Sequence, residues 1–351
     1  MTPVAFIYHP AYGERGFSRV RASWPRYALG RQLLSDLKLM PPPNAIALTE
    51  SISDYPLVEL RPEPARDDEI LAVHSAALLA HIREADARGT GFLDYGDTPA
   101  WSGVWRRATL AVGGTLLAAR LVARGEYKRA FNPAGGLHHA QRDRVAGFCP
   151  LNDLVIAVRA LQSEFGYRRI AIVDLDGHHG DGTEALLYDE SILTISIHRY
   201  GGTFYPRTGA ASDRGQGAGF GYNLNVPLDR GTAGERYRFV FQSQVAPLLR
   251  QFLPQIILVV LGADSHWADP LVRLALGLPD FARLAGDLAK LADEYCEGKM
   301  VVVAGGGYAP EHVARCWAIY LGVLSDAWLS DDPRLKALFD VDRIARQATS
   351  V

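Results

Sequence analysis

The 351-residue chain contains little cysteine and little lysine. Its three cysteines, Cys149, Cys296 and Cys316, are far apart and show no CxxC spacing. That pattern argues against a disulfide framework and against a zinc site built from thiolates. Lysine occurs only at positions 38, 128, 290, 299 and 336, so nearly all of the basic charge is arginine.

The sequence also lacks an excess of charge of either sign and a long hydrophobic run. Lys and Arg number 37 against 39 Asp and Glu, a net charge of −2, with no basic run and no acidic tail. This balance predicts no direct nucleic-acid binding. No stretch approaches 18 uninterrupted apolar residues, and the first residues lack the pattern of a signal peptide. We therefore expect a cytoplasmic protein that does not bind membranes, and a homo-oligomer remains open.

Short β-branched runs alternate with longer helical patterns along the chain. The expected strands are Val4–Tyr8, Arg129–Asn132, Arg169–Leu175, Ile192–His198, Gln255–Leu261 and Lys299–Ala304. The expected helices are Trp105–Arg124, Asn152–Phe165, Ala233–Phe252, Asp280–Glu297 and Pro310–Leu324. This alternation predicts one α/β domain with a mostly parallel central sheet and helices on both faces.

Polar clusters follow four of these strands. They are Gly135–His139, Asp174–Gly182, Gly262–Asp264 and Gly305–Tyr308. In open α/β sheets, sites form beyond the carboxyl ends of the strands. We therefore expect the four clusters to converge on one rim of the sheet, where long loops form the active site.

Three residues of these clusters have the chemistry of metal ligands. Asp176 and His178 are two apart, so an extended backbone points both side chains to the same face. Asp264 would add a second carboxylate from another strand end. Three protein ligands leave an open position, which is the arrangement of catalytic zinc sites. Ligand softness does not separate zinc from ferrous iron here, and for Asp176 and His178 alone a capped strand end is the plainer alternative.

The remaining polar residues suit proton transfer. A neutral imidazole in the His138–His139 pair could take a proton from water and later give it to a leaving amine. Asp174 and Asp181 could orient the two imidazoles. Tyr308 could aim its phenol at an oxyanion. The structural alternatives are a polar turn for the histidines and simple packing for the tyrosine.

Eight motifs occur in the order of one known family. They are GGLHHA (135–140), GFCPLND (147–153), VDLDGHHGDG (173–182), SIHRY (196–200), NVP (225–227), GAD (262–264), GGGY (305–308) and ARCW (314–317). In these the chain resembles the zinc-dependent histone deacetylase family, which includes acetylpolyamine amidohydrolases and acetoin-utilisation proteins. The resemblance runs from about residue 10 to 325. It implies the arginase–deacetylase fold, a single catalytic domain over 1–351 with a C-terminal helical extension at 326–351, and hydrolysis of an acetamide.

The resemblance also implies roles for single residues. One zinc ion per chain would be held by Asp176, His178 and Asp264. A structural potassium ion would be held by Asp174, Asp176, His178, Ser196 and the carbonyl of Ile197. His139 would be the general base and acid, with His138 as its electrostatic partner and Asp174 and Asp181 behind the two rings. Tyr308 would polarise the acetyl carbonyl.

The substrate tunnel of the family gives further expectations. Phe148 and Tyr205 would form its walls, although the family usually has Phe at the second position, and Gly147 and Gly306 would line it. Leu271 would lie near the rim, Asp97 would grip a peptide backbone, and Arg26 would line the acetate exit. Because Leu271 carries no charge, acetyl-lysine is favoured as substrate over an acetylated small amine. A small-molecule deacylase and a non-catalytic binding protein on the same fold remain the alternatives.

Overall fold

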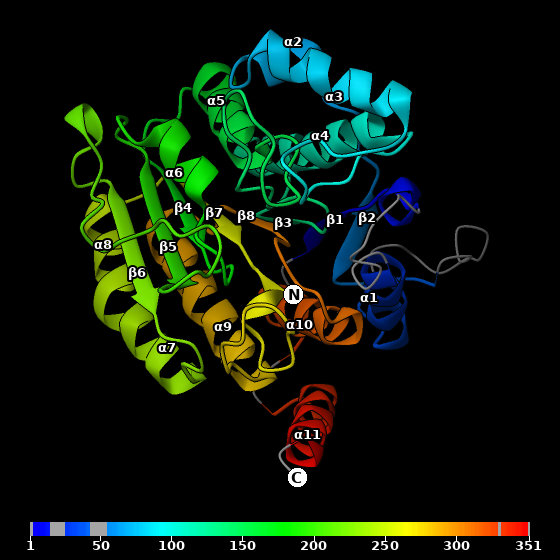
Figure 1. Cartoon of the computed structure of the whole chain (residues 1–351). Helices are drawn as coiled ribbons and strands as arrows, with labels where there is room; N and C mark the ends of the chain where they lie inside the picture. Colours follow the sequence, from blue (N-terminus) through cyan, green and yellow to red (C-terminus); the bar gives the residue numbers. More distant parts are fainter. Residues whose placement is uncertain (1–2, 15–24, 43–54, 329–330, 350–351) are drawn as a thin grey trace.

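The computed structural model describes residues 3–14, 25–42, 55–328 and 331–349. Within these residues, eight parallel strands form one sheet in the order β2-β1-β3-β8-β7-β4-β5-β6 (Figure 1). The strands are β1 Val4–Ile7, β2 Leu57–Leu60, β3 Arg129–Asn132, β4 Ile170–Asp174, β5 Leu193–Arg199, β6 Asn223–Leu228, β7 Ile256–Val260 and β8 Met300–Val303. The predicted α/β architecture with a parallel central sheet is therefore confirmed.

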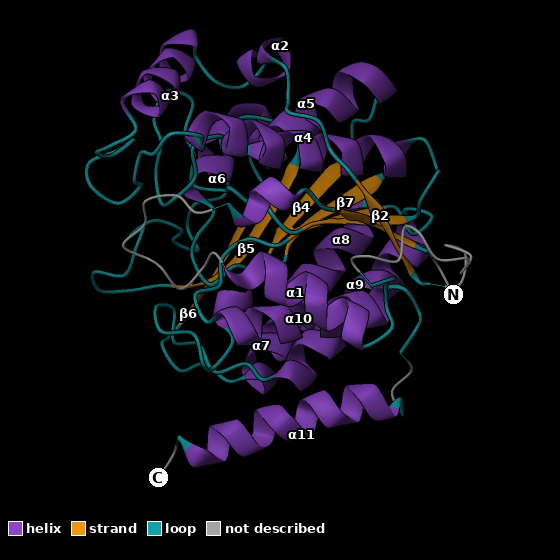
Figure 2. Cartoon of the chain, turned by 90° about the vertical axis from the view of Figure 1, so that its right-hand side faces the viewer, coloured by secondary structure: helices purple, strands orange, loops and turns teal. Residues whose placement is uncertain are grey.

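Helices cover both faces of the sheet. On one face lie α2 Asp67–Leu71, α3 Ala76–Arg88, α4 Val104–Ala123, α5 Asp153–Phe165 and α6 Asp181–Leu187 (Figure 2). On the other lie α1 Pro25–Asp36, α7 Gly234–Val240, α8 Ala246–Phe252, α9 Leu278–Tyr295 and α10 Pro310–Leu324. The last helix, α11 Pro333–Ala348, packs outside α9. None of the described helices has the length and apolar character needed to cross a membrane.

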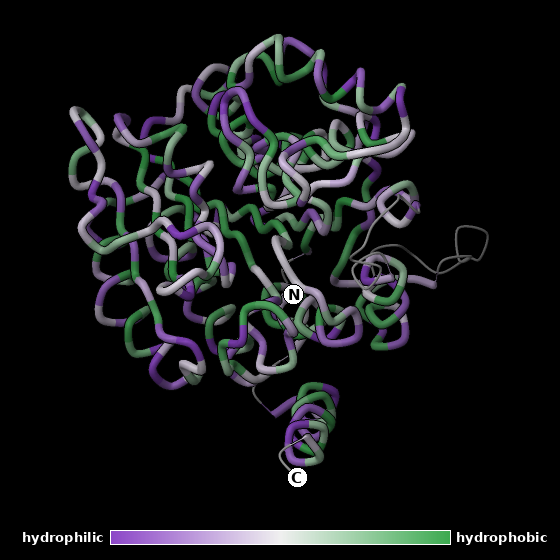
Figure 3. Tube along the Cα trace, viewed as in Figure 1, coloured by the Kyte–Doolittle hydropathy of each residue, from purple (hydrophilic) through white to green (hydrophobic). Residues whose placement is uncertain are grey.

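Two apolar cores follow from this layering. Strands β4, β7 and β8 read IAIVD, IILVV and MVVV, and all of their residues are buried. Their side chains alternate between the core under α1 and α7–α10 and the core under α2–α5. Figure 3 shows the middle of the sheet as its most hydrophobic part. Burial on both faces explains why these strands are continuous apolar runs.

The six predicted strands are confirmed in place, but two edge strands were not predicted. In β2 only Leu57 is buried, and β6 contains Pro227. Neither therefore reads as a continuous apolar run, and Pro is tolerated only at a sheet edge. The predicted single helix Ala233–Phe252 is also wrong in detail. A π-helical turn at Phe241–Val245 interrupts it just before Pro247, which has no main-chain N–H to continue the α-helical ladder.

Sheet order places the four polar clusters together. Strands β3, β8, β7 and β4 are consecutive neighbours, and all of them are parallel. Their carboxyl ends therefore lie side by side at one edge. The segments that follow them carry the histidine pair, Tyr308, Asp264 and Asp176.

Candidate active site

Asp176, His178 and Asp264 meet at the carboxyl ends of β4 and β7. Their ligand atoms all lie within 4.8 Å of one another. His178 Nδ1 is 3.1 Å from Asp176 Oδ1 and 3.0 Å from Asp264 Oδ2. Both carboxylates are at most 1% exposed. One imidazole and two carboxylates converging in this way match the donor set of a three-ligand zinc or iron site.

Main-chain donors fix both carboxylates. Asp176 accepts hydrogen bonds from the N–H of His178 at Oδ1 (2.9 Å) and from the N–H of Gly306 at Oδ2 (2.6 Å). Asp264 Oδ1 accepts one from the N–H of Gly177 (2.8 Å). Asp264 Oδ2 is left facing His178. Such bonds hold carboxylates in a ligating orientation before any ion arrives.

The electrostatics of this group favour a cation. Burial alone would lower the pKa of His178, but Asp176 and Asp264 outweigh it and raise that pKa to about 10. Burial and the neighbouring charge of Asp176 raise the pKa of Asp264 to about 7. Without a metal, the proton on His178 and the partial protonation of Asp264 offset the charge of the two carboxylates, and a bound cation would take the place of these protons.

His138 and His139 lie beside this group, each backed by a carboxylate. His138 Nδ1 is 2.7 Å from Asp174 Oδ2, and His139 Nδ1 is 2.6 Å from Asp181 Oδ1. The two Nε2 atoms are 3.1 Å apart. The rings of His139 and His178 are 5.9 Å apart, centroid to centroid. The pair therefore presents its Nε2 atoms beside the predicted metal ligands.

The two histidines have opposite pKa shifts. Burial would lower the pKa of His138, but the charges of Asp174 and Asp176 raise it to about 9. Burial and the proximity of His138 lower the pKa of His139 to about 4, although Asp181 opposes the shift. At neutral pH the pair carries one positive charge, on His138, and His139 is neutral. A neutral imidazole is the form that can accept a proton.

Tyr308 extends from the glycine turn after β8 toward the same point. Its ring lies 6.4 Å from that of His178, nearly perpendicular to it. Its N–H donates to Asp269 Oδ2 at 2.9 Å. Burial, with Asp264 and Asp176 nearby, raises its pKa well above the usual value. The phenol therefore keeps its proton and can act as a hydrogen-bond donor.

A cavity of about 150 Å³ opens onto these residues. Among the residues lining it are Gly147, Phe148, Gly306 and Tyr308, together with His138, His139, Asp176 and His178. Phe148 has a φ of 65°, which is rare for a side chain of this size, and is 38% exposed. Its N–H donates to Thr98 Oγ1 (3.0 Å). This backbone geometry projects the ring to the mouth of the cavity, opposite Tyr308 at 6.2 Å.

Tyr205 and Asp97 are not among the residues that line the cavity, but each is next to one that does, His139 and Thr98 respectively. The Tyr205 ring packs edge-on against His139 with centroids 5.0 Å apart, so it forms a wall beside the histidine pair. Asp97 is exposed, and its N–H donates to Asp94 Oδ1 (2.8 Å). Burial raises the pKa of Tyr205, and Asp181, Asp97 and Asp94 add to the shift, so both loop carboxylates lie near its hydroxyl. Leu271 is 44% exposed and does not line the cavity.

The inner end of the cavity is basic. Arg26 donates to the carbonyls of Gly305 (3.2 Å) and Gly307 (3.3 Å). Both Arg26 (2.9 Å) and Arg107 (3.0 Å) donate to the hydroxyl of Tyr27. All three residues line the cavity. Arg26 therefore lines the cavity, and its role toward a carboxylate product remains a prediction.

Of the predicted potassium ligands, Asp176 and His178 belong to the metal group itself, and the others lie on β4 and β5. Asp174 and Ser196 are paired residues of β4 and β5. Asp174 Oδ1 accepts the N–H of Asp176 (3.0 Å), and Ser196 Oγ lies 2.9 Å from His198 Nδ1. The structure thus brings Asp174 and Ser196 together, next to Asp176. Bound potassium remains a prediction.

Two buried carboxylates of the site were not predicted from the sequence. Asp153 accepts hydrogen bonds from the N–H of Gly136 (3.0 Å) and Leu137 (2.7 Å), so it holds the turn that presents the histidine pair. Asp269 holds the main chain of Tyr308. Asp153 ends the motif GFCPLND, and Asp269 follows Asp264 by five residues. Those positions are the only signals in the sequence that could have drawn attention to them.

Comparison with known proteins is consistent with this geometry. A histone deacetylase domain matches residues 40–324. The chain is 34% identical over 275 residues to the acetoin utilization protein AcuC of Bacillus subtilis, covering 75% of this chain and 71% of that protein. It is 38% identical over 259 residues to a probable deacetylase of Archaeoglobus fulgidus, covering 73% and 70%. The crystal structure of the HDA15 HD domain is similar with a TM-score of 0.82 and 26% identity, covering 96% of this chain and 92% of that one.

Proposed function

The chain belongs to the histone deacetylase family, and from that premise we propose that it hydrolyses the acetamide of acetyl-lysine, with a divalent cation held by Asp176, His178 and Asp264. The observation that carries the proposal is a single cavity lined by Asp176, His178, the histidine pair and Tyr308, with Asp264 in contact with His178. A divalent cation bound there would lower the pKa of a water molecule and polarise the acetyl carbonyl. We propose zinc, and iron(II) suits the same donors.

His139 is the proposed proton carrier. Its Nε2 is unprotonated at neutral pH and can take a proton from the attacking water, while Asp181 holds Nδ1–H. The same Nε2 then returns the proton to the departing amine nitrogen, so no free amide anion is needed. His138 keeps its positive charge beside the reacting carbonyl and stabilises the negative charge that develops there.

Tyr308 is the proposed oxyanion donor. Its protonated phenol stands across from the metal ligands, and Asp269 fixes its main chain. A donor that meets the oxygen only when negative charge develops lowers the barrier without tightening substrate binding. Loss of one such donor costs about 10²–10³ in kcat.

The cavity suits a long apolar chain that ends in an acetamide. Phe148 and Tyr205 offer apolar ring faces at its mouth, where the methylene chain of a lysine would lie. The exposed Asp97 is available to main-chain N–H groups of a peptide. We also propose that potassium binds as a structural ion at Asp174, Asp176, His178, Ser196 and the carbonyl of Ile197.

A small acetylated polyamine is the second candidate. The carboxylates of Asp94 and Asp97 lie near the Tyr205 hydroxyl and would attract a second, cationic amine of such a substrate. Leu271 adds no charge to this side.

The test compares kcat/KM of the zinc-loaded protein on an acetyl-lysine peptide and on N-acetylputrescine, with Tyr308→Phe as the paired variant. We expect higher efficiency on the peptide and a kcat for Tyr308→Phe lower by about 10²–10³. Higher efficiency on N-acetylputrescine would instead favour the polyamine candidate. No turnover of either substrate with zinc or iron(II) would contradict the proposed function and favour a binding protein.

A further inference from the structure

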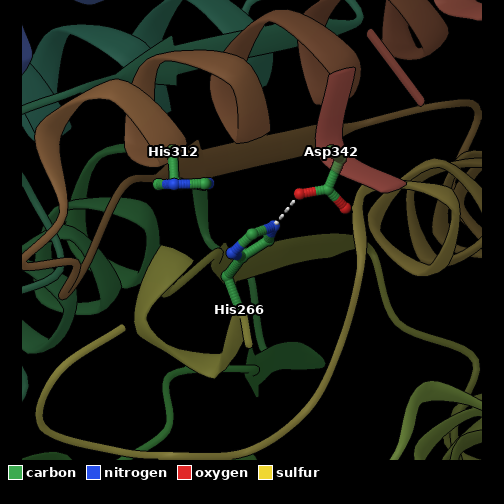
Figure 4. A group of neighbouring side chains, drawn as sticks. All are labelled: His266, His312 and Asp342. Carbon is green, nitrogen blue, oxygen red and sulfur yellow. Dashed lines mark ion pairs between the residues drawn. The ribbon is translucent and has the colours of Figure 1, made fainter. Parts of the chain in front are cut away.

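A second group of ligand-type side chains lies away from the cavity. His266 follows the metal ligand Asp264 by two residues, His312 is in the first turn of α10, and Asp342 is in α11 (Figure 4). Asp342 is 3% exposed and His266 is fully buried. Helix α11 lies beyond residues 40–324, the part matched by the deacetylase domain. This chain therefore buries a carboxylate of its C-terminal helix against the segment that carries Asp264.

The contacts of this group favour an anchor over a metal site. The N–H of Ala268 donates to His266 Nδ1 (3.2 Å), so the lone pair of that nitrogen is already engaged. His266 Nε2 forms an ion pair with Asp342 Oδ1 at 3.0 Å. Asp342 also accepts the indole N–H of Trp267 at Oδ1 (2.9 Å) and the N–H of Leu278 at Oδ2 (3.1 Å). One carboxylate thus accepts two hydrogen bonds and pairs with His266.

His266 and Trp267 lie near the start of the segment 262–277, and Leu278 begins α9 immediately after that segment. The His312 ring stands beside that of His266, 4.8 Å away, and its Nδ1 has no hydrogen-bond partner among the described residues. From helix α11, Asp342 therefore contacts residues near both ends of the segment 262–277.

Inside this segment, Asp269 links the anchor to the catalytic tyrosine. The N–H of Asp269 donates to the carbonyl of His266 (3.0 Å). Its carboxylate accepts the N–H of Leu271 (2.8 Å), of Val272 (3.0 Å) and of Tyr308 (2.9 Å). A chain of direct contacts therefore runs from Asp342 through His266 and Trp267 to Asp269 and then to the backbone of Tyr308.

We propose that α11 is a positioning element of the active site, with Asp342 acting through the 262–277 segment to hold Tyr308 in place. This inference rests on the proposed function, because it concerns the tyrosine assigned to the oxyanion. Asp342 touches no substrate. The proposal predicts that Asp342 affects the placement of the Tyr308 hydroxyl through the main chain of Tyr308, so its loss lowers kcat and leaves substrate affinity nearly unchanged.

The test uses Asp342→Asn, with Asp340→Asn as the matched control. Asparagine keeps the shape of the side chain but places an NH₂ group opposite one of the N–H donors. One hydrogen bond to the side chain at position 342 is therefore lost. Asp340 lies on the same helix, is exposed, and pairs only at the surface with Arg343 (3.1 Å). A misplacement of about 1 Å costs up to about 10² in rate. We expect kcat to fall about tenfold in Asp342→Asn, with KM changed less than threefold, and no change in Asp340→Asn.

The same substitution in a Tyr308→Phe background separates positioning from general loosening. If Asp342 acts through the tyrosine hydroxyl, adding Asp342→Asn to Tyr308→Phe lowers kcat no further. An equal loss in both backgrounds overturns the proposal. So does wild-type kcat in a folded Asp342→Asn variant. Should that variant fail to fold, Trp267→Phe removes a single donor, and we expect a smaller loss of kcat that again vanishes in the Tyr308→Phe background.

Two readouts do not depend on turnover. Metal analysis of wild type should give one equivalent of zinc, unchanged in Asp342→Asn, and a second equivalent lost on substitution would overturn the anchor in favour of a metal site. Amide hydrogen exchange should speed up at residues 262–277 and at Tyr308 in Asp342→Asn but not in Asp340→Asn, and unchanged exchange would overturn the proposal. An inactive wild type would contradict the proposed function alone, because hydrogen exchange still decides whether α11 holds the segment.

Discussion

Replacing Gly306 by alanine should disable the metal group without straining the backbone. The φ of Gly306 lies outside the left-handed region, so alanine can adopt it. An added Cβ, however, would lie 2.4 Å from Asp264 Oδ2 and 2.9 Å from Asp176 Oδ2. The shorter contact is roughly 1 Å inside an ordinary van der Waals distance. One carboxylate must therefore move.

The carboxylates have little room to yield. Asp264 is fully buried, with Oδ1 held by the N–H of Gly177, and Asp176 is held by the N–H of Gly306 itself. Misdirected ligands lower metal affinity by about 10- to 100-fold. A displacement of about 1 Å at the reacting centre costs about 10² in rate. We expect Gly306→Ala to show both losses.

The assay measures zinc content after equilibration in a metal buffer and kcat/KM on an acetyl-lysine peptide. Gly286→Ala is the matched control, because a Cβ there meets nothing within 4 Å and α9 gains helix propensity. Full zinc content together with kcat/KM within threefold of wild type in Gly306→Ala would refute this reasoning about the ligand geometry.

Three further outcomes follow from single contacts. Asp153→Ala leaves two main-chain N–H groups and one hydroxyl without their buried acceptor. Urea unfolding should show that the free energy of unfolding falls by about 3 kcal/mol or more. A fall under 1 kcal/mol would contradict the role of Asp153 in holding the turn before His138. Burial lowers the pKa of His74, so this ring stays neutral in the folded protein. The free energy of unfolding should therefore be full above pH 6.5 and fall by up to about 1.4 kcal/mol per pH unit below it. If the reasoning holds, His74→Gln flattens this pH dependence. Asp181→Asn keeps a hydrogen-bond acceptor for His139 Nδ1 but removes the negative charge beside it, so kcat should fall by about 10- to 100-fold. An unchanged kcat would show that the charge of Asp181 does not matter.

Much of the site could be predicted from the sequence because its parts follow simple local rules. Asp176 and His178 are two residues apart after a buried strand, and Asp264 follows another such strand. Parallel strands bring these ends to one edge, and here β4 and β7 are direct neighbours. The close approach of the predicted metal ligands therefore needed no knowledge of the loops.

The parts of the fold and site that could not be predicted depend on contacts between segments that are distant in the sequence. Asp153 and Asp269 act on main-chain groups 16 and 39 residues away, and nothing local marks a carboxylate for such a task. Asp342 reaches Leu278 over 64 residues from an amphipathic helix, in which it is one of several charged residues. Edge strand β2 was not predicted because only half of its residues face a core. Only the folded chain shows which polar residues are buried.

The central claim is that Asp176, His178 and Asp264 hold a catalytic cation. The most direct measurement removes metal with a chelator, assays hydrolysis of an acetyl-lysine peptide, and then restores zinc or iron(II) one equivalent at a time. The account predicts loss of activity on chelation, full recovery at one equivalent, and no recovery in Asp264→Ala. Undiminished turnover by the metal-free protein would contradict it, as would full recovery in Asp264→Ala.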